Sequence, residues 1–205
     1  AERVTGKDER VSATLSLLGK MLMMEPPIRI ESFDISNISG TDIVASMVVF
    51  QSGKPYKSGY KRFKLEGLSD QDDYASMHQI VKRRFTHYKS GDNGFEAAPD
   101  LLLIDGGVNH ARTAVSALEA LNLSFPVFGM VKDDRHRTRA LVTPEGQEIR
   151  IDNNPAIFSL IGTIQEETHR FAITYHRQLR SKRLRYSELD EIPGIGPKRK
   201  QELLR

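Results

Sequence analysis

Cysteine is absent from this sequence of 205 residues, and long apolar runs are absent too. Without cysteine the chain can form neither disulfides nor thiolate metal sites. No apolar run approaches the roughly 20 residues of a membrane-spanning helix, and no signal peptide opens the sequence. Neither an internal repeat nor a low-complexity stretch is present. With a hydrophobic share of 39% and a charged share of 28%, the composition indicates an ordinary soluble globular protein, expected in the cytoplasm.

The length allows one well-cored domain with a small appendage. Ala1 at the first position is consistent with a piece of a longer protein. The net charge of +3 is uneven, because nine Lys/Arg and only four Asp/Glu lie between His176 and Arg205. A nearly neutral body with a basic tail suggests a polyanionic partner for the tail. A solvated basic helix would show the same pattern.

The apolar spacing and turn residues predict the order βββ, α, β, α, β, hairpin, α. The expected strands lie at 28–36, twice within 41–65, at 101–104 and at 126–131, with a hairpin at 140–151. The expected helices lie at 8–24, 72–90, 111–121 and 154–185. On the second of these helices we expect one buried side, made of Tyr74, Met77, Ile80, Val81 and Phe85. This order favours an α/β fold, a mixed sheet with helices on both faces.

A carboxylate stands where the apolar strand at 101–104 ends, because Asp105 follows Ile104 and precedes Gly106 and Gly107. Neither the dinucleotide-binding glycine pattern nor the phosphate-loop pattern fits this turn, so no nucleotide cofactor is expected. The remaining functional interpretation is a metal ligand, which requires a second carboxylate nearby. A simple turn or helix cap is the structural alternative.

Asp34 is the candidate for that second carboxylate. It follows Ile30 and Phe33 in a strand that should be half buried, where an unpaired carboxylate costs several kcal/mol. If the first and fourth strands are neighbours, Asp34 and Asp105 could share an ion. Oxygen ligands of this kind favour Mg²⁺ or Mn²⁺.

His169 is the third candidate. The last helix has an apolar stripe that should face the sheet, and His169 lies at its rim, in line with Ile161 and Gln165. From there it could reach the strand ends as a metal ligand or a proton-transfer group. An ordinary polar residue at the edge of the stripe is the alternative.

Four strings in this sequence resemble the endonuclease domain of the UvrC family of bacterial nucleotide excision repair proteins: "FDISNISG", "DDYASM", "LLLIDGG" and "EETHRFAITYHR". The order of elements resembles the ribonuclease H-like fold. The similarity runs in order over nearly the whole chain, and the tail "LDEIPGIGPKRKQELL" resembles the helix-hairpin-helix motif that follows the nuclease in this family.

The resemblance implies a catalytic site made of Asp34, Asp105 and His169, with Asp73 of "DDYASM" as a further acidic position. Asp73 could equally be a charge at a helix N-terminus. His169 stands where ordinary ribonuclease H sites have a carboxylate, so one firmly held ion, on Asp34 and Asp105, is expected. His169 could then orient or deprotonate a water, or protonate the leaving oxygen.

Two basic segments are the expected DNA contacts. The loop "KDDRHRTR" carries Lys132, Arg135, Arg137 and Arg139, which the resemblance places beside the active site. In "IPGIGPK" two glycines allow a close approach to phosphate. The candidate DNA-binding residues of this second segment are Gly194, Gly196, Lys198 and Arg199. A solvated loop and a plain turn are the respective alternatives.

The resemblance predicts three parts: a linker or packing segment at 1–24, a nuclease domain at 25–186 and a truncated helix-hairpin-helix motif at 187–205. It implies a metal-dependent excision endonuclease that makes the 5′ incision in damaged double-stranded DNA, in the UvrABC system and the SOS response. UvrB, and UvrA upstream, would be its partners. The 3′ cut and the UvrB contact belong to other parts of such proteins. An inactive DNA-binding scaffold and a resolvase- or transposase-like nuclease are the competing interpretations.

Overall fold

The computed structural model describes residues 2–38, 42–65 and 72–190. Two compact units divide the chain, residues 1–172 and residues 173–205. Within the described ranges, no helix has both the length and the apolar character that crossing a membrane requires. The predicted catalytic residues Asp34, Asp73, Asp105 and His169 all belong to the first unit.

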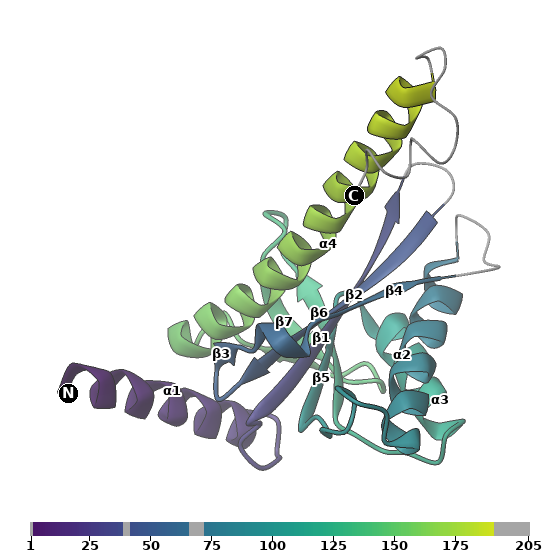
Figure 1. Cartoon of the computed structure of the whole chain (residues 1–205). Helices are drawn as coiled ribbons and strands as arrows, with labels where there is room; N and C mark the ends of the chain where they lie inside the picture. Colours follow the sequence, from purple (N-terminus) through teal and green to yellow (C-terminus); the bar gives the residue numbers. More distant parts are fainter. Residues whose placement is uncertain (1, 39–41, 66–71, 191–205) are drawn as a thin grey trace. The chain divides into compact units, whose positions relative to one another are not determined.

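A mixed eight-stranded sheet forms the centre of the first unit (Figure 1). Its strands are β1 (Arg29–Ile38), β2 (Asp42–Gln51), β3 (Lys54–Pro55), β4 (Lys61–Lys64), β5 (Leu101–Ile104), β6 (Val127–Lys132), β7 (Thr138–Val142) and β8 (Glu148–Arg150). They follow the order β3-β2-β1-β5-β6-β7-β8, and β4 also pairs with β2. The pairs β1–β5 and β5–β6 are parallel, and the others are antiparallel. The predicted α/β class with a mixed sheet is confirmed.

The three strands predicted at 28–36 and within 41–65 are present as β1, β2 and β4, which form an antiparallel meander, with one addition after β2. Ser52 and Gly53 have φ of 49° and 70°, the left-handed pair of a tight hairpin turn. The chain therefore reverses at once into the short strand β3. The 3₁₀ helix η1 (Lys57–Gly59) then precedes β4.

Helices cover both faces of the sheet, as the alternation of elements predicted. On one face, α2 (Asp73–Ser90) and α3 (Val108–Glu119) lie side by side and pack on residues such as Phe33, Met47 and Ile104 (Figure 1). On the other, α1 (Glu2–Met21) and the part of α4 (Pro155–Asp190) that belongs to the first unit pack on residues such as Ile30 and Leu103. Since all of β5 is buried, it has to be apolar on both sides.

The buried side of α2 matches the prediction except at Tyr74. Met77, Ile80, Val81 and Phe85 are buried as predicted, but Tyr74 is 47% exposed and its ring lies on His110. The expectation for Tyr74 is wrong because the first turn of α2 contacts the first turn of α3 rather than the sheet. Leu15 and Leu18 of α1, and Leu22 directly after it, are buried in the core.

A buried ion pair fastens α2 to β1. Arg84 donates two hydrogen bonds to the carboxylate of Glu31, at 2.8 and 3.1 Å, and both side chains are essentially inaccessible to solvent. Arg29 binds the same carboxylate, and Arg84 also donates to the carbonyls of Phe95 and Ala97. Charges this deeply buried need several partners, and this set supplies them.

Candidate active site

Asp34 and Asp105 occupy corresponding positions on two neighbouring parallel strands, Asp34 within β1 and Asp105 directly after β5. Phe33 on β1 is in register with Ile104 on β5, and the N–H of Asp105 donates to the Phe33 carbonyl at 2.9 Å. The residue after each of these two is an aspartate, so both carboxylates point to the face that α4 covers. Their side chains are 10% and 5% exposed. The structure therefore brings together the two carboxylates that the sequence predicted as partners.

Crowding explains Gly106, the first of the two glycines after Asp105, and Gly129 on the neighbouring strand. A Cβ on Gly106 would lie 2.6 Å from the His110 ring. A Cβ on Gly129 of β6 would lie 2.5 Å from the carbonyl oxygen of Gly106. Neither position has room for a side chain, so the turn needs glycine to pass beside β6 and under His110.

Lys132 forms an ion pair with Asp105. It is the last residue of β6, the parallel neighbour of β5, and its Nζ lies 2.7 Å from Oδ1 of Asp105. A carboxylate that is 5% exposed requires such a partner. The predicted DNA contact of Lys132 stays a prediction, and the ion pair with Asp105 adds a role that the sequence did not indicate.

His169 reaches the same edge of the sheet from α4. Its Nδ1 lies 3.9 Å from Oδ2 of Asp34, beyond hydrogen-bond distance, and its side chain is 62% exposed. The preceding residue, Thr168, is fully buried, and its Oγ1 lies 2.6 Å from the Ile164 carbonyl oxygen and 3.0 Å from Ser32 Oγ. Because a carbonyl can only accept, the Thr168 hydroxyl donates to Ile164 and accepts from Ser32. Ser32 and Asp34 share one face of β1, so the Ser32–Thr168 bond fixes the position of His169 relative to Asp34.

Asp73 and Asp105 both act on His110, a residue that sequence reasoning missed. Burial lowers the pKa of the His110 imidazole, and the charges of Asp73 and Asp105 oppose that effect. The Tyr74 ring covers His110 with 4.6 Å between ring centroids. Asp73 therefore belongs to the surroundings of Asp105, and the position of His110 one helical turn after "DGG" was the only signal for it.

The donor set fits a hard divalent cation held by few protein ligands. Among the described residues, no three His, Cys, Asp or Glu side chains group to enclose a metal. Mg²⁺, however, is commonly held by one or two carboxylates, with water and substrate phosphate as the other ligands. Ser46, in register with Asp34, adds a buried hydroxyl oxygen that has no hydrogen-bond partner in the described part of the chain. Asp34, Asp105 and this hydroxyl are all oxygen donors, as such an ion prefers.

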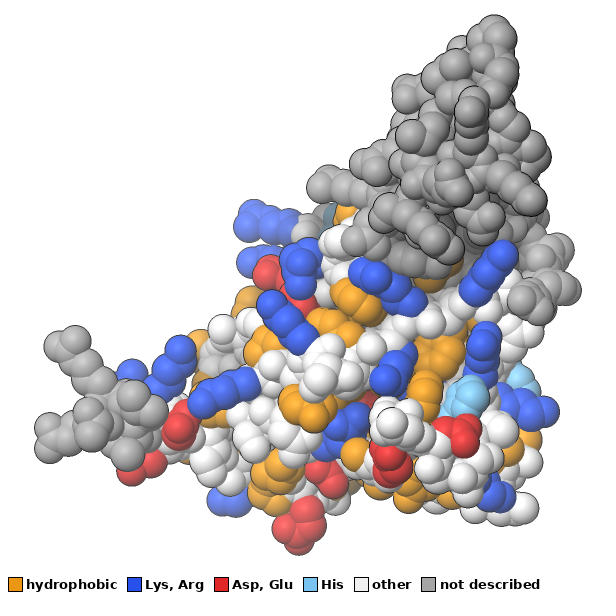
Figure 2. Space-filling model, viewed as in Figure 1, with side chains coloured by type: hydrophobic (Ala, Val, Ile, Leu, Met, Phe, Trp, Pro, Cys, Tyr) orange, Lys and Arg blue, Asp and Glu red, His pale blue; other side chains and the backbone are white. Residues whose placement is uncertain are grey.

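Two of the other predicted DNA-contacting arginines, one in the loop after β6 and one on β7, form ion pairs within the chain. Arg137 pairs with Asp133 at 3.1 Å, and Arg139 pairs with Glu148 at 3.0 Å. Hydrogen bonds from the backbone N–H of Arg137, from that of Arg135 and from the Arg137 side chain hold the pKa of the Asp133 carboxyl below its usual value. Arg135 is exposed. Figure 2 shows Lys and Arg side chains spread singly over the face in view, which suits dispersed phosphate contacts.

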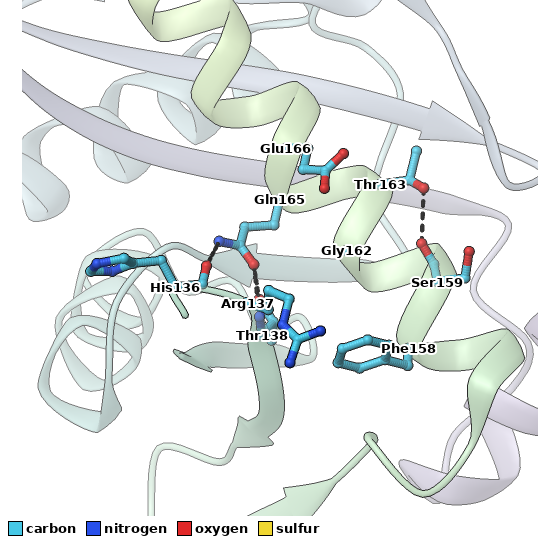
Figure 3. Close-up of a pocket in the computed structure, with 9 residues that line it drawn as sticks. All are labelled: His136, Arg137, Thr138, Phe158, Ser159, Gly162, Thr163, Gln165 and Glu166. Carbon is cyan, nitrogen blue, oxygen red and sulfur yellow. Dashed lines mark hydrogen bonds between the residues drawn. The ribbon is translucent and has the colours of Figure 1, made fainter. Parts of the chain in front are cut away.

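Gln165 ties this loop to α4, one helical turn before His169. Its amide nitrogen donates to the His136 carbonyl at 2.8 Å (Figure 3). Its amide oxygen accepts from the N–H of Thr138 at 2.9 Å and from the Thr138 hydroxyl. Because Gln165 is buried, these bonds hold the loop firmly. Gly194, Gly196, Lys198 and Arg199 lie outside the described residues, and their DNA contacts stay predictions.

Comparison with known proteins identifies the family. The sequence model described as the UvrC RNAse H endonuclease domain matches residues 19–173. The chain belongs to this family. Residues 19–172 of the first unit, which hold the paired aspartates, fall within the match.

The relatives with known names agree with this membership. The chain is 48% identical over 210 residues to UvrABC system protein C of Clostridium novyi, covering 96% of this chain and 34% of that protein. It is 51% identical over 177 residues to UvrABC system protein C of Caldicellulosiruptor saccharolyticus, covering 86% and 29%. The chain thus spans about a third of the length of these relatives.

Solved structures resemble the chain only distantly. Ciona intestinalis endonuclease V in complex with an inosine-containing DNA is 14% identical, with 65% of this chain and 59% of that one covered and a TM-score of 0.39. Human ENDOV is 13% identical, with 60% and 67% covered and a TM-score of 0.34. The site described above rests on this chain's own geometry and not on these two proteins.

Proposed function

We propose that this chain is the nuclease unit of a UvrC protein and makes the 5′ incision in damaged double-stranded DNA during nucleotide excision repair. Its family membership supports nuclease activity. The observation that carries the proposal is the pairing of Asp34 and Asp105 at one strand edge, with His169 facing Asp34 at 3.9 Å. Paired carboxylates on the face of a sheet have no packing reason to be there, whereas phosphodiester cleavage needs them.

Asp34 and Asp105 would hold a divalent cation, for which we propose Mg²⁺ or Mn²⁺. When bound, such an ion supplies charge to the scissile phosphate and lowers the pKa of a water. Lys132 would neutralise further charge at the phosphate, since its ammonium group already lies at Asp105. Exposed and beside Asp34, His169 could take the proton of the attacking water or give one to the leaving oxygen.

The finer parts of the proposal concern partners and domains. We propose that UvrB, with UvrA upstream, delivers the nuclease to its site in the cytoplasm, and that the protein takes part in the SOS response. We also propose a nuclease domain at 25–186 and the start of a helix-hairpin-helix motif at 187–205. The UvrABC names of the relatives support the partners, and the sequence "IPGIGPK" supports the motif.

The test uses isosteric variants of the full-length protein. Asp34→Asn and Asp105→Asn should each abolish the 5′ cut and leave the 3′ cut intact, because either loss empties the same site. Glu119→Gln is the matched control, an exposed carboxylate on α3 remote from this strand edge. Gel analysis of end-labelled damaged duplex separates the two cuts. Normal 5′ incision by either aspartate variant would refute the proposal and favour an inactive scaffold.

A further inference from the structure

A pocket of about 370 Å³ opens between α4 and the loop that joins β6 to β7 (Figure 3). Gln165 closes one side of it through its bonds to His136 and Thr138. Glu166 lies three residues before His169 on α4, and Gly162 lies seven before it. At 1.5 Å per residue the pocket therefore begins within about 10 Å of the candidate catalytic histidine, along the helix axis.

Gly162 keeps the pocket open. A Cβ added there would meet nothing within 4 Å, so packing does not require glycine. Glycine inside a helix is unfavourable relative to alanine, by roughly 0.5–1 kcal/mol. Glycine at this position therefore destabilises the helix, and no close packing of a neighbour against it compensates for that loss. What it provides is empty volume beside Phe158, one helical turn away.

The wall of the pocket offers a surface on which a flat group can stack. Figure 3 shows the Phe158 ring and the Arg137 guanidinium pointing toward one another. The central carbon of the guanidinium, Cζ, lies 5.7 Å from the ring centroid. This separation is near the limit of a cation–π contact. Arg137 is otherwise held by a solvent-exposed ion pair with Asp133, which costs little to rearrange. Moving the Arg137 guanidinium aside would open this face of the ring to a planar ligand, with Arg137 packed beside it.

The polar groups at the rim select the kind of planar ligand. Glu166 is an exposed carboxylate, which repels phosphate and accepts hydrogen bonds from amino groups. Ser159 and Thr163 add hydroxyls, and that of Thr163 donates to the Ser159 carbonyl while its own oxygen can still accept. Stacking combined with acceptors suits a nucleobase bearing an exocyclic amino group, since Glu is a known partner for the cytosine amino group.

We propose that this pocket binds a single unstacked nucleobase of the cut strand, close to the scissile phosphate, and prefers cytosine over thymine. The inference rests on the proposed nuclease function. The volume of the pocket, about 370 Å³, is at the small end of the range for ligand pockets and suits one nucleotide rather than a duplex. Holding one base would fix the strand along α4, so that the neighbouring phosphate meets Asp34, Asp105 and His169.

Photo-crosslinking in the full-length protein, loaded on damaged duplex, tests the proposal. Single 5-iodocytosines are placed at successive positions within three nucleotides of the 5′ cut, in an Asp105→Asn background that keeps the strand whole. One position, or two adjacent ones, should crosslink to the peptide that contains Phe158. Gly162→Leu fills the pocket and should remove this crosslink. Ala156→Leu adds the same side chain at an exposed position of α4 and should keep it.

Incision assays in the background with Asp105 intact separate this inference from the proposed function. Gly162→Leu should slow the 5′ cut about tenfold without changing the 3′ cut, and Ala156→Leu should match the parent. Replacing cytosine by thymine at the crosslinked position should slow the parent about fivefold, a discrimination that Glu166→Gln should reduce. A parent that cuts on the 5′ side but gives no crosslink to Phe158 overturns the pocket and leaves the nuclease intact. A 5′ cut that persists in Asp105→Asn overturns the nuclease assignment itself.

Discussion

Lys132 and Asp105 form an ion pair at the candidate metal site. An ammonium 2.7 Å from one carboxylate oxygen compensates the charge of Asp105 when no metal is bound. A divalent ion at the same carboxylate would compete with it. Lys132 thus stabilises the metal-free protein while weakening its affinity for metal.

Lys132→Met is therefore expected to have two opposite effects. Without metal it should destabilise the protein by about 1–2 kcal/mol, because a carboxylate that is 5% exposed loses its partner. Addition of Mn²⁺ should raise the melting temperature of the variant by more than it raises that of the parent. Thermal melts in EDTA and across a Mn²⁺ titration measure both effects, with Lys20→Met on the exposed side of α1 as control. Equal Mn²⁺ stabilisation of parent and variant would contradict the competition.

His169→Ala should slow the 5′ incision by about 10²–10⁴ while Mn²⁺ still binds. The two aspartates supply the charge that holds a hard cation, and His169 lies 3.9 Å from the nearer one, within reach of a shared water. Rate measurements paired with a Mn²⁺ titration decide its role, and His78→Ala serves as the control. Metal affinity lost in parallel with activity would make His169 a ligand instead.

Glu167 gives the stability of the protein a predicted pH dependence. Hydrogen bonds from Arg170, and then from the Tyr60 hydroxyl, hold the pKa of this carboxyl below its ordinary value. A lowered pKa contributes stability that is complete above the ordinary value of 4.5 and is lost as the pH falls through the lowered pKa. Glu167→Gln should cost about 1 kcal/mol at pH 7 and progressively less below about pH 4.5. Denaturant melts from pH 3 to 7 measure it; a difference independent of pH would contradict this assignment.

Among the elements, α4 matters most for the site, because polar bonds to separate parts of the sheet layer fix it near His169. Gln165 binds the loop before β7 and β7 itself, Thr168 binds β1, and Glu167 binds Tyr60 just before β4. Apolar packing of the stripe allows small sliding of a helix, whereas hydrogen bonds have defined directions. These bonds therefore set where His169 stands relative to Asp34.

The Thr168–Ser32 bond provides the sharpest test of this positioning. Thr168→Val keeps the shape and removes the hydroxyl, leaving Ser32 without its acceptor, so the 5′ cut should slow about tenfold. Thr168→Ser should restore the rate. Ser32→Ala combined with Thr168→Val should cost little more than Thr168→Val alone, because both changes remove the Ser32–Thr168 bond. A loss of stability without any loss of rate, or additive losses of rate, would mean that the bond only supports the fold.

The elements that carry the aspartates could be predicted because their signals are local. Four consecutive apolar residues before Asp105 indicate a buried strand, and the β-formers around Asp34 indicate another. The pairing of Lys132 with Asp105 could not be predicted, since it depends on β6 lying parallel beside β5. The Gln165 bonds depend in the same way on where a loop crosses a helix. Tyr74 had the correct helical phase, but its burial depended on how far α2 extends past the sheet.

At the scale of the whole molecule, charge and core are distributed differently along the chain. The surplus of nine basic over four acidic residues lies between His176 and Arg205, beyond the first unit. The buried hydrophobic clusters belong to residues 15–164. Changes at the C-terminal end should therefore alter the affinity for DNA, whereas changes at the N-terminal end should alter folding.

Removing residues from 188 onward should weaken DNA binding and leave the melting temperature within about 2 °C, because no residue of the described core is lost. Fewer phosphate contacts should also make binding less sensitive to salt. Removing residues 1–22 should instead prevent folding. It takes away buried Leu15, Leu18 and Leu22, each worth about 2–5 kcal/mol on truncation, against a total stability of about 5–15 kcal/mol. Calorimetry and salt-dependent DNA titrations compare the two truncations. A large drop in melting temperature after the first truncation would mean that the nuclease domain extends beyond 186.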